Sequence, residues 1–371
     1  MKILVFNWQD IRNPLGGGAE VHLHEIFKRL AQRGHEVTLY CSRFRGSEAG
    51  ETIDGIRVVR GGGRNFFNYS VPFRYRKEFA GERYDVIVDD INKIPFYTPL
   101  FVKEPVVGIL HHLFGTSIFS EAPFPAALYV LASEWMALRI YRNTRIAVVS
   151  ESTKQELISH GFRRDLLHIV PNCVDHQVYQ SVLRAGQGNV IGYLGRLKKY
   201  KSVEHLLSAF AIVLKETPDA RLVIVGEGDA RKGLELFARD LRIAQSVEFT
   251  GYVTQETKVG YLNRMKFAVN TSAKEGWGLT VIEANACGVP LIASDVSGLR
   301  DSVLHEKTGL LYDYGDIEQL AEKMLLLLRD EHLRSRLSRE ALEWAGTFHW
   351  DRSADAMLDV LTGAADGGHN A

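Results

Sequence analysis

Short apolar runs rich in β-branched residues alternate with stretches of helical periodicity along most of the chain. The first unit shows both patterns. A strand-like run at 3–6 (ILVF) is followed by a glycine-rich turn at 15–20 (LGGGAE), and apolar residues then recur at helical spacing between 23 and 31 until Gly34. Because parallel strands are joined by crossover helices, this alternation predicts an α/β fold built on parallel sheets.

The alternation pauses once, which marks a domain boundary. Residues 176–188 (HQVYQSVLRAGQG) are polar, lack strong periodicity and end in glycine, so we predict a linker there. The tandem sets on either side predict two Rossmann-like domains, at 1–175 and 189–347. A last helix is predicted at 350–362 and a disordered tail at 363–371. The remaining strands are predicted at 36–41, 56–60, 84–89, 105–110, 145–150, 168–170, 189–195, 221–226 and 267–272.

Composition narrows the class of protein. The 45 basic and 45 acidic side chains balance, so no global field attracts nucleic acid, and we expect no nucleic-acid partner. The 3 cysteines are too far apart for a zinc or redox motif, which favours a cytoplasmic protein. The longest apolar stretch, at 125–141, is interrupted by Glu134 and Arg139, so we expect no transmembrane span and only peripheral contact with a membrane.

The first candidate site is the glycine-rich turn of the N-terminal domain. Gly16, Gly17 and Gly18 come after the first strand and before a helix, where the backbone can approach a phosphate closely. A flexible turn explains the same glycines equally well. A second triplet at 61–63 has no helical pattern after it, and a mobile loop explains it better than a ligand site.

The second candidate site lies in the C-terminal domain. Arg196 and Lys201 directly follow a predicted strand, where they would suit a diphosphate, although a solvated basic turn is the alternative. Downstream, the stretch 272–295 places Glu275 and Glu283 around a loop with two glycines and the start of a helix. The free amides of that helix would face a phosphate or sugar hydroxyls, since its first turn lacks intrahelical acceptors.

These motifs resemble those of the retaining family 4 of nucleotide-sugar glycosyltransferases. The resemblance covers nearly the whole chain through GGGAE, PNCVD, GRLKKYK and VGEG, and is most specific in EGWGLTVIE, an E-x7-E element. It implies the GT-B fold: two Rossmann-like domains with a cleft between them and a C-terminal helix that crosses back to the N-terminal domain. It also implies a nucleoside-diphosphate sugar as co-substrate and no cofactor.

The resemblance assigns a role to each matching position. Arg196 and Lys201 match the cations that hold the donor diphosphate, Glu275 matches the acid at the donor sugar, and His111 matches a histidine near the anomeric carbon, with its neighbour His112 left open. Glu283 matches the acid that binds the ribose. The remaining donor-binding positions are Gly16, Gly17, Gly18, Gly226, Glu227, Tyr252, Val253, Gly276, Trp277, Gly278 and Leu279.

The chemistry follows from departure of a diphosphate. Negative charge grows on the leaving oxygen, and Arg196, Lys201 and a helix end would stabilise it without a metal. The pair Asp89 and Asp90 lies in the N-terminal domain, where we expect it to shape an acceptor loop. Retention by double displacement would require a carboxylate nucleophile, but the resemblance favours same-face attack, with Glu275 as a positioning and electrostatic residue.

The acceptor is expected on the N-terminal domain. Residues 57–77 contain six cations and no acid, interleaved with aromatic residues. This segment fits either an anionic membrane surface or lipid phosphate, or a solvated rim whose aromatic residues enter the core. If the segment is a solvated rim, we expect the protein to be free in the cytoplasm. If the segment contacts a membrane, we expect the protein at the inner face of that membrane.

The sequence therefore predicts a retaining, metal-independent hexosyltransferase that moves a sugar from a UDP- or GDP-sugar to a hydroxyl acceptor such as a growing glycan, a glycolipid or a small molecule. Two alternatives stay open: a nucleotide-sugar epimerase or isomerase on the same fold, and a non-catalytic nucleotide-sugar binding module. The base, the sugar, the acceptor, the linkage and the oligomeric state are not determined by the sequence.

Overall fold

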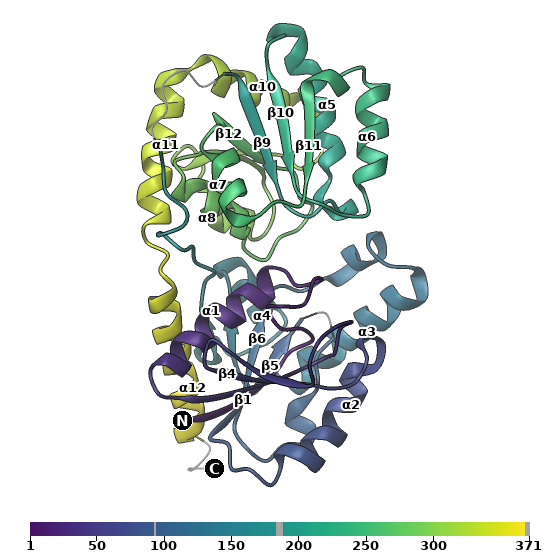
Figure 1. Ribbon diagram of the computed structural model, residues 1–371, viewed down its shortest axis with the longest axis vertical. Helices are drawn as coiled ribbons and strands as arrows, with labels where there is room; N and C mark the ends of the chain where they lie inside the picture. The colour runs from purple at the N-terminus through teal and green to yellow at the C-terminus, as the bar shows by residue number, and fades with distance from the viewer. Residues whose placement is uncertain (93, 183–187, 368–371) are drawn as a thin grey trace. The chain divides into compact units, whose positions relative to one another are not determined.

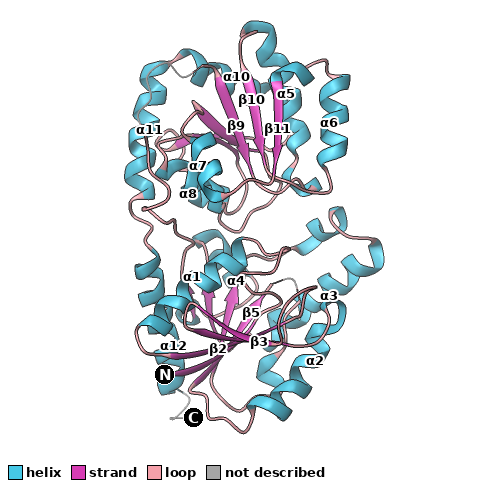
Figure 2. Ribbon diagram, in the orientation of Figure 1, coloured by secondary structure: helices cyan, strands magenta, loops and turns pink. Residues whose placement is uncertain are grey.

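The computed structural model describes residues 1–92, 94–182 and 188–367 (Figure 1). The chain forms two compact units. The first unit comprises Met1–Asn172 together with the C-terminal segment from Trp350, and the second unit comprises Cys173–His349. Each unit is a sheet covered by helices, so the expected pair of Rossmann-like domains is confirmed (Figure 2).

The first unit contains an eight-stranded sheet in the order β3-β4-β2-β1-β5-β6-β7-β8. All neighbouring pairs are parallel except β3 with β4, which form an antiparallel hairpin at one edge. The central strands are buried on both faces, which explains their continuous apolar runs. The strands are β1 Lys2–Phe6, β2 Glu36–Cys41, β3 Gly50–Ile53, β4 Ile56–Arg60, β5 Val86–Ile91, β6 Val106–Leu110, β7 Arg145–Val148 and β8 Leu167–Ile169.

Helices cover both faces of this sheet. The α-helices are α1 Gly18–Gln32, α2 Phe67–Arg74, α3 Phe124–Ile140, α4 Glu151–Ser159 and α12 Trp350–Gly367. Short helical turns are η1 Arg64–Phe66, η2 Tyr75–Phe79, η3 Thr98–Leu100, η4 Gly115–Ser120 and η5 Arg164–Leu166. Under α2 lies an aromatic core in which the ring of Phe6 packs edge-on against the rings of Tyr40 and Phe79.

The C-terminal helix α12 packs on the first unit, as expected. The ring of Trp350 lies 6.2 Å from the ring of His22 on α1, and Ser353 donates a hydrogen bond of 2.9 Å to the carbonyl of Pro171. The predicted end of this helix was wrong: α12 continues to Gly367, because Leu361 and Ala364 are buried against the first unit. Residues 368–371 of the predicted tail lie outside the described residues.

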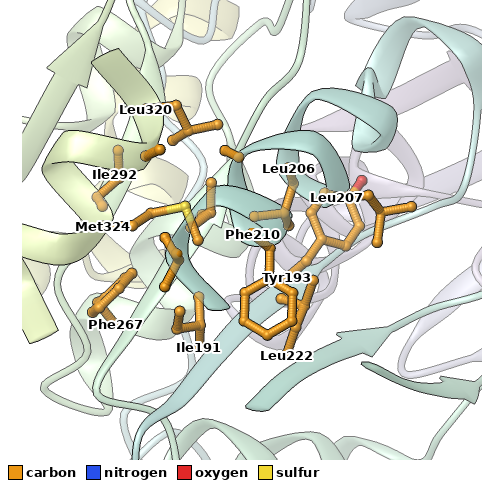
Figure 3. Packing of buried hydrophobic residues seen from close by; sticks show 14 of the residues in the cluster. Ile191, Tyr193, Leu206, Leu207, Phe210, Leu222, Phe267, Ile292, Leu320 and Met324 are labelled. Atoms are coloured by element: carbon orange, nitrogen blue, oxygen red, sulfur yellow. The ribbon is translucent and has the colours of Figure 1, made fainter. Parts of the chain in front are cut away.

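The second unit contains a six-stranded parallel sheet in the order β11-β10-β9-β12-β13-β14. Its core gathers apolar side chains of both sheet and helices, among them Tyr193, Phe210 and Phe267 (Figure 3). The strands are β9 Val190–Leu194, β10 Arg221–Val225, β11 Val247–Gly251, β12 Phe267–Asn270, β13 Leu291–Ser294 and β14 Gly309–Tyr312. The helices are α5 Val203–Glu216, α6 Arg231–Asp240, α7 Gln255–Leu262, α8 Leu279–Ala286, α9 Leu299–Ser302, α10 Ile317–Arg329 and α11 Glu331–Ala345, with short turns η6 Lys199–Lys201 and η7 Ala244–Ser246.

The segment predicted as a linker begins within the second unit. His176 bonds through Nε2 to the carbonyl of Phe348 at 2.9 Å, and Val182 donates its amide to Asn263 at 2.7 Å. Residues 183–187 of this predicted linker lie outside the described residues. In the part of the chain that is described, no helix is both long and apolar enough to cross a bilayer.

Candidate functional site

In the second unit, the predicted site residues gather in loops that follow the carboxyl ends of neighbouring strands. Thr271, directly after β12, donates its hydroxyl to the carbonyl of Lys201 at 2.8 Å, and the amide of Ala273 bonds to the carbonyl of Tyr200 at 2.8 Å. These bonds fasten the loop after β9 to the loop after β12. They bring Lys201 next to Glu275, which is 74 positions away in the chain.

Lys201 and Glu275 form an ion pair through Nζ and Oε1. Their side chains are only 13% and 15% exposed, so the pair is largely shielded from water. Burial by itself lowers the pKa of Lys201, but the charge of Glu275 outweighs it, so the pKa of Lys201 is raised and the ammonium is charged at neutral pH. Ser272 donates a further hydrogen bond of 2.9 Å to Glu275.

Arg196 lies in the same loop as Lys201 but is exposed. Among the described residues, no carboxylate pairs with its guanidinium. The adjacent Lys198, by contrast, is bound to Asp229 at 2.7 Å. Arg196 therefore presents a free cation at the carboxyl end of β9, whereas Lys198 belongs to a solvated surface pair.

The loop after β10 lies directly against the loop after β9. The amide of Leu197 bonds to the carbonyl of Glu227 at 2.9 Å, and a Cβ at Gly226 would lie 1.9 Å from the carbonyl oxygen of Gly195. Only glycine fits there, because the two backbones touch. Glu227 is paired with Arg231 at 2.6 Å, and this hydrogen bond lowers the pKa of Glu227.

Tyr252 and Val253 directly follow the carboxyl end of β11, the strand next to β10 in the sheet. Tyr252 is 86% exposed, so its ring is available to a ligand and contributes nothing to the core. Gly226 and Gly251 form an isolated bridge, which joins the loop after β10 to the end of β11. The structure therefore places four of the predicted donor-binding positions, Gly226, Glu227, Tyr252 and Val253, on two adjoining loops.

The loop before α8 is held in an unusual backbone conformation. Gly278 caps the helix with a φ of +81°, and Gly276, Trp277 and Gly278 are buried. Behind this loop stands Gly298, where a Cβ would lie 2.2 Å from the carbonyl oxygen of Glu275. The first backbone hydrogen bond of α8 runs from the amide of Val281 to the carbonyl of Gly278. The amide of Leu279 comes before this bond, so it has no acceptor within the helix.

Glu283 lies one turn into α8 and is anchored on one side only. Its Oε1 accepts hydrogen bonds from Tyr179 at 2.6 Å and from Lys258 at 2.7 Å. Its Oε2 is buried and has no hydrogen-bond partner among the described residues. A buried carboxylate oxygen without a donor is costly, so this atom is suited to accept a ligand hydroxyl.

The sequence did not predict the two residues that hold Glu283, which are Tyr179 and Lys258. Tyr179 stands in the segment assigned to the linker, and Lys258 stands on α7 with its Nζ 5.1 Å from the centre of the Tyr179 ring. Burial and the charge of Glu283 raise the pKa of Tyr179, so it remains a hydrogen-bond donor. No local signal links these residues to Glu283, because the contact between Tyr179 and Glu283 spans 104 positions.

In the first unit, the glycine turn precedes α1 at the carboxyl end of β1. Gly17 is the N-cap residue, and its amide donates a hydrogen bond of 2.6 Å to the carboxylate of Glu20. At Gly18 a Cβ would meet nothing within 4 Å, whereas at Gly16 it would lie 3.1 Å from the carbonyl oxygen of Asn13. Glu20 thus occupies one of the amides that the sequence reasoning offered to a phosphate.

His111 follows β6 and is part of a buried cluster. Its Nε2 lies 2.9 Å from Oδ1 of Asp90 at the end of β5, and its ring lies edge-on to His22 with centroids 5.4 Å apart. Burial alone lowers the pKa of His111, but the charge of Asp90 and its hydrogen bond, with Glu20 nearby, raise it above its usual value. The alternative histidine, His112, instead packs its ring 4.4 Å from that of Phe114.

Asp89, adjacent to Asp90, points to the other side of the strand and shapes a loop. It accepts hydrogen bonds from the amide of Phe96 at 3.4 Å and from the hydroxyl of Thr98 at 2.9 Å. Burial raises the pKa of Asp89 to about 6 although these hydrogen bonds lower it. Within the described residues, no three His, Cys, Asp or Glu side chains form a group that could hold a metal ion.

The basic and aromatic segment 57–77 is divided between core and surface. Arg60 is buried between Asp10 and Glu51, with both ion pairs at 2.6 Å, so this cation cannot meet a membrane. Phe67 and Tyr75 are also buried. The aromatic residues Phe66, Tyr69 and Phe73 are 73%, 56% and 73% exposed, and Arg76 and Lys77 are exposed as well.

Comparison with known proteins adds two family matches. Residues 16–178 match a family model described as Glycosyltransferase Family 4, and residues 177–344 match one described as Glycosyl transferases group 1. The chain is 28% identical to a D-inositol 3-phosphate glycosyltransferase of Thermomonospora curvata, over 94% of this chain and 91% of that protein. It is 27% identical to a GDP-mannose-dependent phosphatidylinositol monomannoside mannosyltransferase of Mycobacterium tuberculosis, over 94% and 96%.

Solved structures share the fold. Sucrose-phosphate synthase from Thermosynechococcus elongatus superimposes with a TM-score of 0.81 at 21% identity, covering 96% of this chain and 97% of that one. Anabaena HepE, solved in complex with UDP and glucose, superimposes with a TM-score of 0.76 at 20% identity, covering 98% of this chain and 100% of its own.

Proposed function

Because this chain belongs to the family 4 glycosyltransferases and has their GT-B fold, we propose that it is a retaining hexosyltransferase that uses a UDP- or GDP-sugar. The observation that carries the proposal is the ion pair of Lys201 with Glu275, which forms at the carboxyl ends of the strands in the loop that leads into α8, the helix of Glu283. A nucleotide-sugar donor is supported by HepE, a protein of the same fold that was solved in complex with UDP-glucose.

The donor would bind through three kinds of contact. Arg196 and Lys201 bind the diphosphate, the amides of the loop before α8 bind phosphate or sugar hydroxyls, and the free Oε2 of Glu283 accepts a ribose hydroxyl. Glu275 already holds Lys201 in place, so the donor phosphate would compete with this carboxylate for the ammonium group. A fixed cation stabilises the transition state without reorganising as charge develops.

Transfer breaks the bond between the anomeric carbon and the phosphate oxygen, and the electron pair stays on that oxygen. The acceptor oxygen forms a new bond to the anomeric carbon on the same face, and its proton passes to the departing phosphate. Glu275 then acts as a positioning and electrostatic residue. A covalent sugar adduct trapped on Glu275 would contradict this mechanism and indicate double displacement.

The acceptor would be a hydroxyl compound. One relative is a D-inositol 3-phosphate glycosyltransferase, which is named after a phosphorylated hydroxyl compound. Within 57–77, we propose peripheral membrane contact only for the exposed residues, which are Phe66, Tyr69, Phe73, Arg76 and Lys77. Sedimentation with liposomes tests it, and equal partition with and without anionic lipid would dismiss it.

A thermal-shift screen against UDP-, GDP- and ADP-sugars tests the central proposal. A ligand at 100 times its dissociation constant adds about 2.7 kcal/mol to the free energy of unfolding. We expect one nucleotide class to stabilise the protein and Lys201→Ala to abolish that shift, while Lys199→Ala, which removes an exposed lysine of the same turn, preserves it. No shift with any nucleotide sugar would refute the proposal.

A further inference from the structure

The first unit contains a groove that the donor site does not use. It runs between α3, α4 and the turn η4, and its volume is about 430 Å³. Leu113, Leu131, Trp135 and Leu138 form its apolar wall. The groove shares Leu113, Glu134 and Leu138 with a smaller, mostly apolar cavity that is also lined by His112, the neighbour of His111.

Two arginines stand along this groove without a carboxylate partner in the described part of the chain. The guanidinium carbon of Arg139 lies 3.3 Å from the centre of the Trp135 ring, so the cation lies over one residue of the apolar wall. Arg142 donates to the backbone carbonyl of His160 at 3.3 Å. Both side chains are exposed, so their remaining N–H groups are available to an anion.

The carboxylates of the groove do not neutralise these arginines directly. Both oxygens of Glu134 are engaged by backbone amides, those of Phe114 at 2.6 Å and Gly115 at 2.9 Å. Glu156 also lines the groove, while the hydrogen bonds of Arg139 and Arg142 run to the backbone carbonyls of Trp135 and His160. The positive side chains are therefore the ones free to bind a ligand.

Helix α3, which supplies Leu131, Trp135 and Leu138 to the groove, also has several exposed apolar side chains. On α3, Phe124, Leu128, Trp135 and Met136 are between 42% and 69% exposed. The hydroxyl of Tyr129 on this helix lies 2.8 Å from that of Tyr69, which joins α3 to the exposed aromatic side chains of α2. Exposed apolar side chains clustered on neighbouring elements indicate a binding surface, and a small polar ligand would leave them unused.

We propose that this groove binds a phosphate-bearing lipid, with the apolar chain along Leu131, Trp135 and Leu138 and the phosphate beside Arg139 and Arg142. The two unpaired arginines are the reason for a phosphate, and the apolar wall together with the exposed apolar side chains of α3 is the reason for an apolar lipid chain. Identifying this lipid as the sugar acceptor rests on the proposed function. The binding itself does not, because every groove residue belongs to the first unit.

Calorimetric titration of the full chain with dodecyl phosphate, below its critical micelle concentration, tests the proposal. Inorganic phosphate and dodecyl maltoside supply the head group and the chain separately. We expect dodecyl phosphate to bind at least 10-fold more tightly than either. The double variant Arg139→Gln/Arg142→Gln should lose at least 10-fold in that affinity, whereas Arg45→Gln/Arg83→Gln, which removes two exposed arginines elsewhere in the same unit, should not.

Three outcomes would overturn the inference. Equal binding of inorganic phosphate indicates a small-anion site, equal binding of dodecyl maltoside indicates an uncharged apolar surface, and absence of dodecyl phosphate binding leaves no site at all. A melting curve of each variant excludes misfolding. Nucleotide-sugar stabilisation measured on the same samples separates the two proposals: if it persists while dodecyl phosphate fails to bind, only the groove assignment is wrong.

Discussion

The Nε2 atom of His111 lies 2.9 Å from Oδ1 of Asp90, where β5 and β6 end side by side in the first unit. The hydrogen bond fixes the orientation of the ring and leaves Nδ1 as the nitrogen not held by Asp90. His22 packs edge-on against the same ring. A histidine held in this way presents one defined ring edge to a ligand, which a freely rotating side chain would not do.

Asp90→Asn should lower the pKa of His111, because it removes the negative charge that raises this pKa against the effect of burial. A raised histidine pKa stabilises the fold most fully below the unfolded value of about 6.5 and less as the pH rises through the folded value. The variant should therefore lose more stability at pH 5 than at pH 8. Nuclear magnetic resonance titration of His111 and melting at both pH values check this, and an unchanged titration would contradict it.

Tyr179→Phe should weaken nucleotide binding. The hydroxyl bonds to Glu283 at 2.6 Å, and hydrogen bonds to charged groups contribute about 1.5 to 3 kcal/mol, so we expect at least a 10-fold rise in the Kd of the nucleotide. The matched control is Tyr261→Phe, which removes an exposed hydroxyl bound to Glu248 at 2.8 Å. Equal affinities of the two variants in direct titration would show that Tyr179 does not prepare Glu283.

The tandem parallel sheets could be predicted because parallel strands are buried on both faces and therefore appear in the sequence as runs of consecutive apolar residues. The hairpin strand β3 could not, since its run Gly50–Ile53 has a single buried residue. Its turn did carry a signal: Asp54 and Gly55 have φ values of 49° and 86°, and an Asp-Gly pair favours such a hairpin turn. The end of α12 was missed because burial of Ala364 outweighs the glycines that follow.

Lys201, Glu275 and Glu283 could be predicted as candidate site residues because each belongs to a sequence motif that follows a predicted strand. Sequence alone could not reveal which atoms of these residues are already engaged. The ion pair of Lys201 with Glu275 spans 74 positions and depends on hydrogen bonds between two loops. Tyr179 could not be predicted either, since its role comes from a tertiary contact while its local sequence is typical of a linker.

Gly298→Ala should disturb the loop before α8 more than a left-handed backbone alone explains. Gly298 has a φ of +81°, and the added Cβ would lie 2.2 Å from the carbonyl oxygen of Glu275. Gly315, with a φ of +92° and open space around it, is the control for backbone strain. Gly315→Ala should cost about 1 to 2 kcal/mol and leave donor affinity intact.

Gly298→Ala, by contrast, should cost more stability than Gly315→Ala and should also weaken donor binding, because it displaces Glu275 and the amides beside it. Chemical unfolding measures the first effect, and titration with the nucleotide sugar identified by screening measures the second. Equal stability losses and equal affinities in the two variants would show that the contact behind the loop is not important.

His22 should contribute to acid denaturation. Burial is the main cause that lowers the pKa of His22 to about 3, so the folded protein keeps this ring neutral while the unfolded chain protonates it below about pH 6.5. Stability due to this group is therefore present above that pH and declines as the pH falls toward 3. His22→Gln should reduce the slope of the free energy of unfolding against pH in this range by the equivalent of about one bound proton. His332→Gln, at an exposed position, should leave the slope unchanged. Parallel pH profiles of wild type and His22→Gln would contradict this.

Turnover should be insensitive to metal removal, because Arg196 and Lys201 can supply the positive charge that a metal would otherwise bring to the leaving diphosphate. Charge of Glu275 keeps the pKa of Lys201 raised despite its burial, so the ammonium persists through neutral pH. We expect EDTA to leave kcat unchanged and Lys201→Met to reduce it by roughly 100-fold, the effect of losing one fixed transition-state donor. Activity that disappears with EDTA and returns with magnesium or manganese would contradict the prediction. Rescue of Lys201→Met by either cation, with wild type unaffected by EDTA, would instead support a shared electrostatic role for lysine and metal.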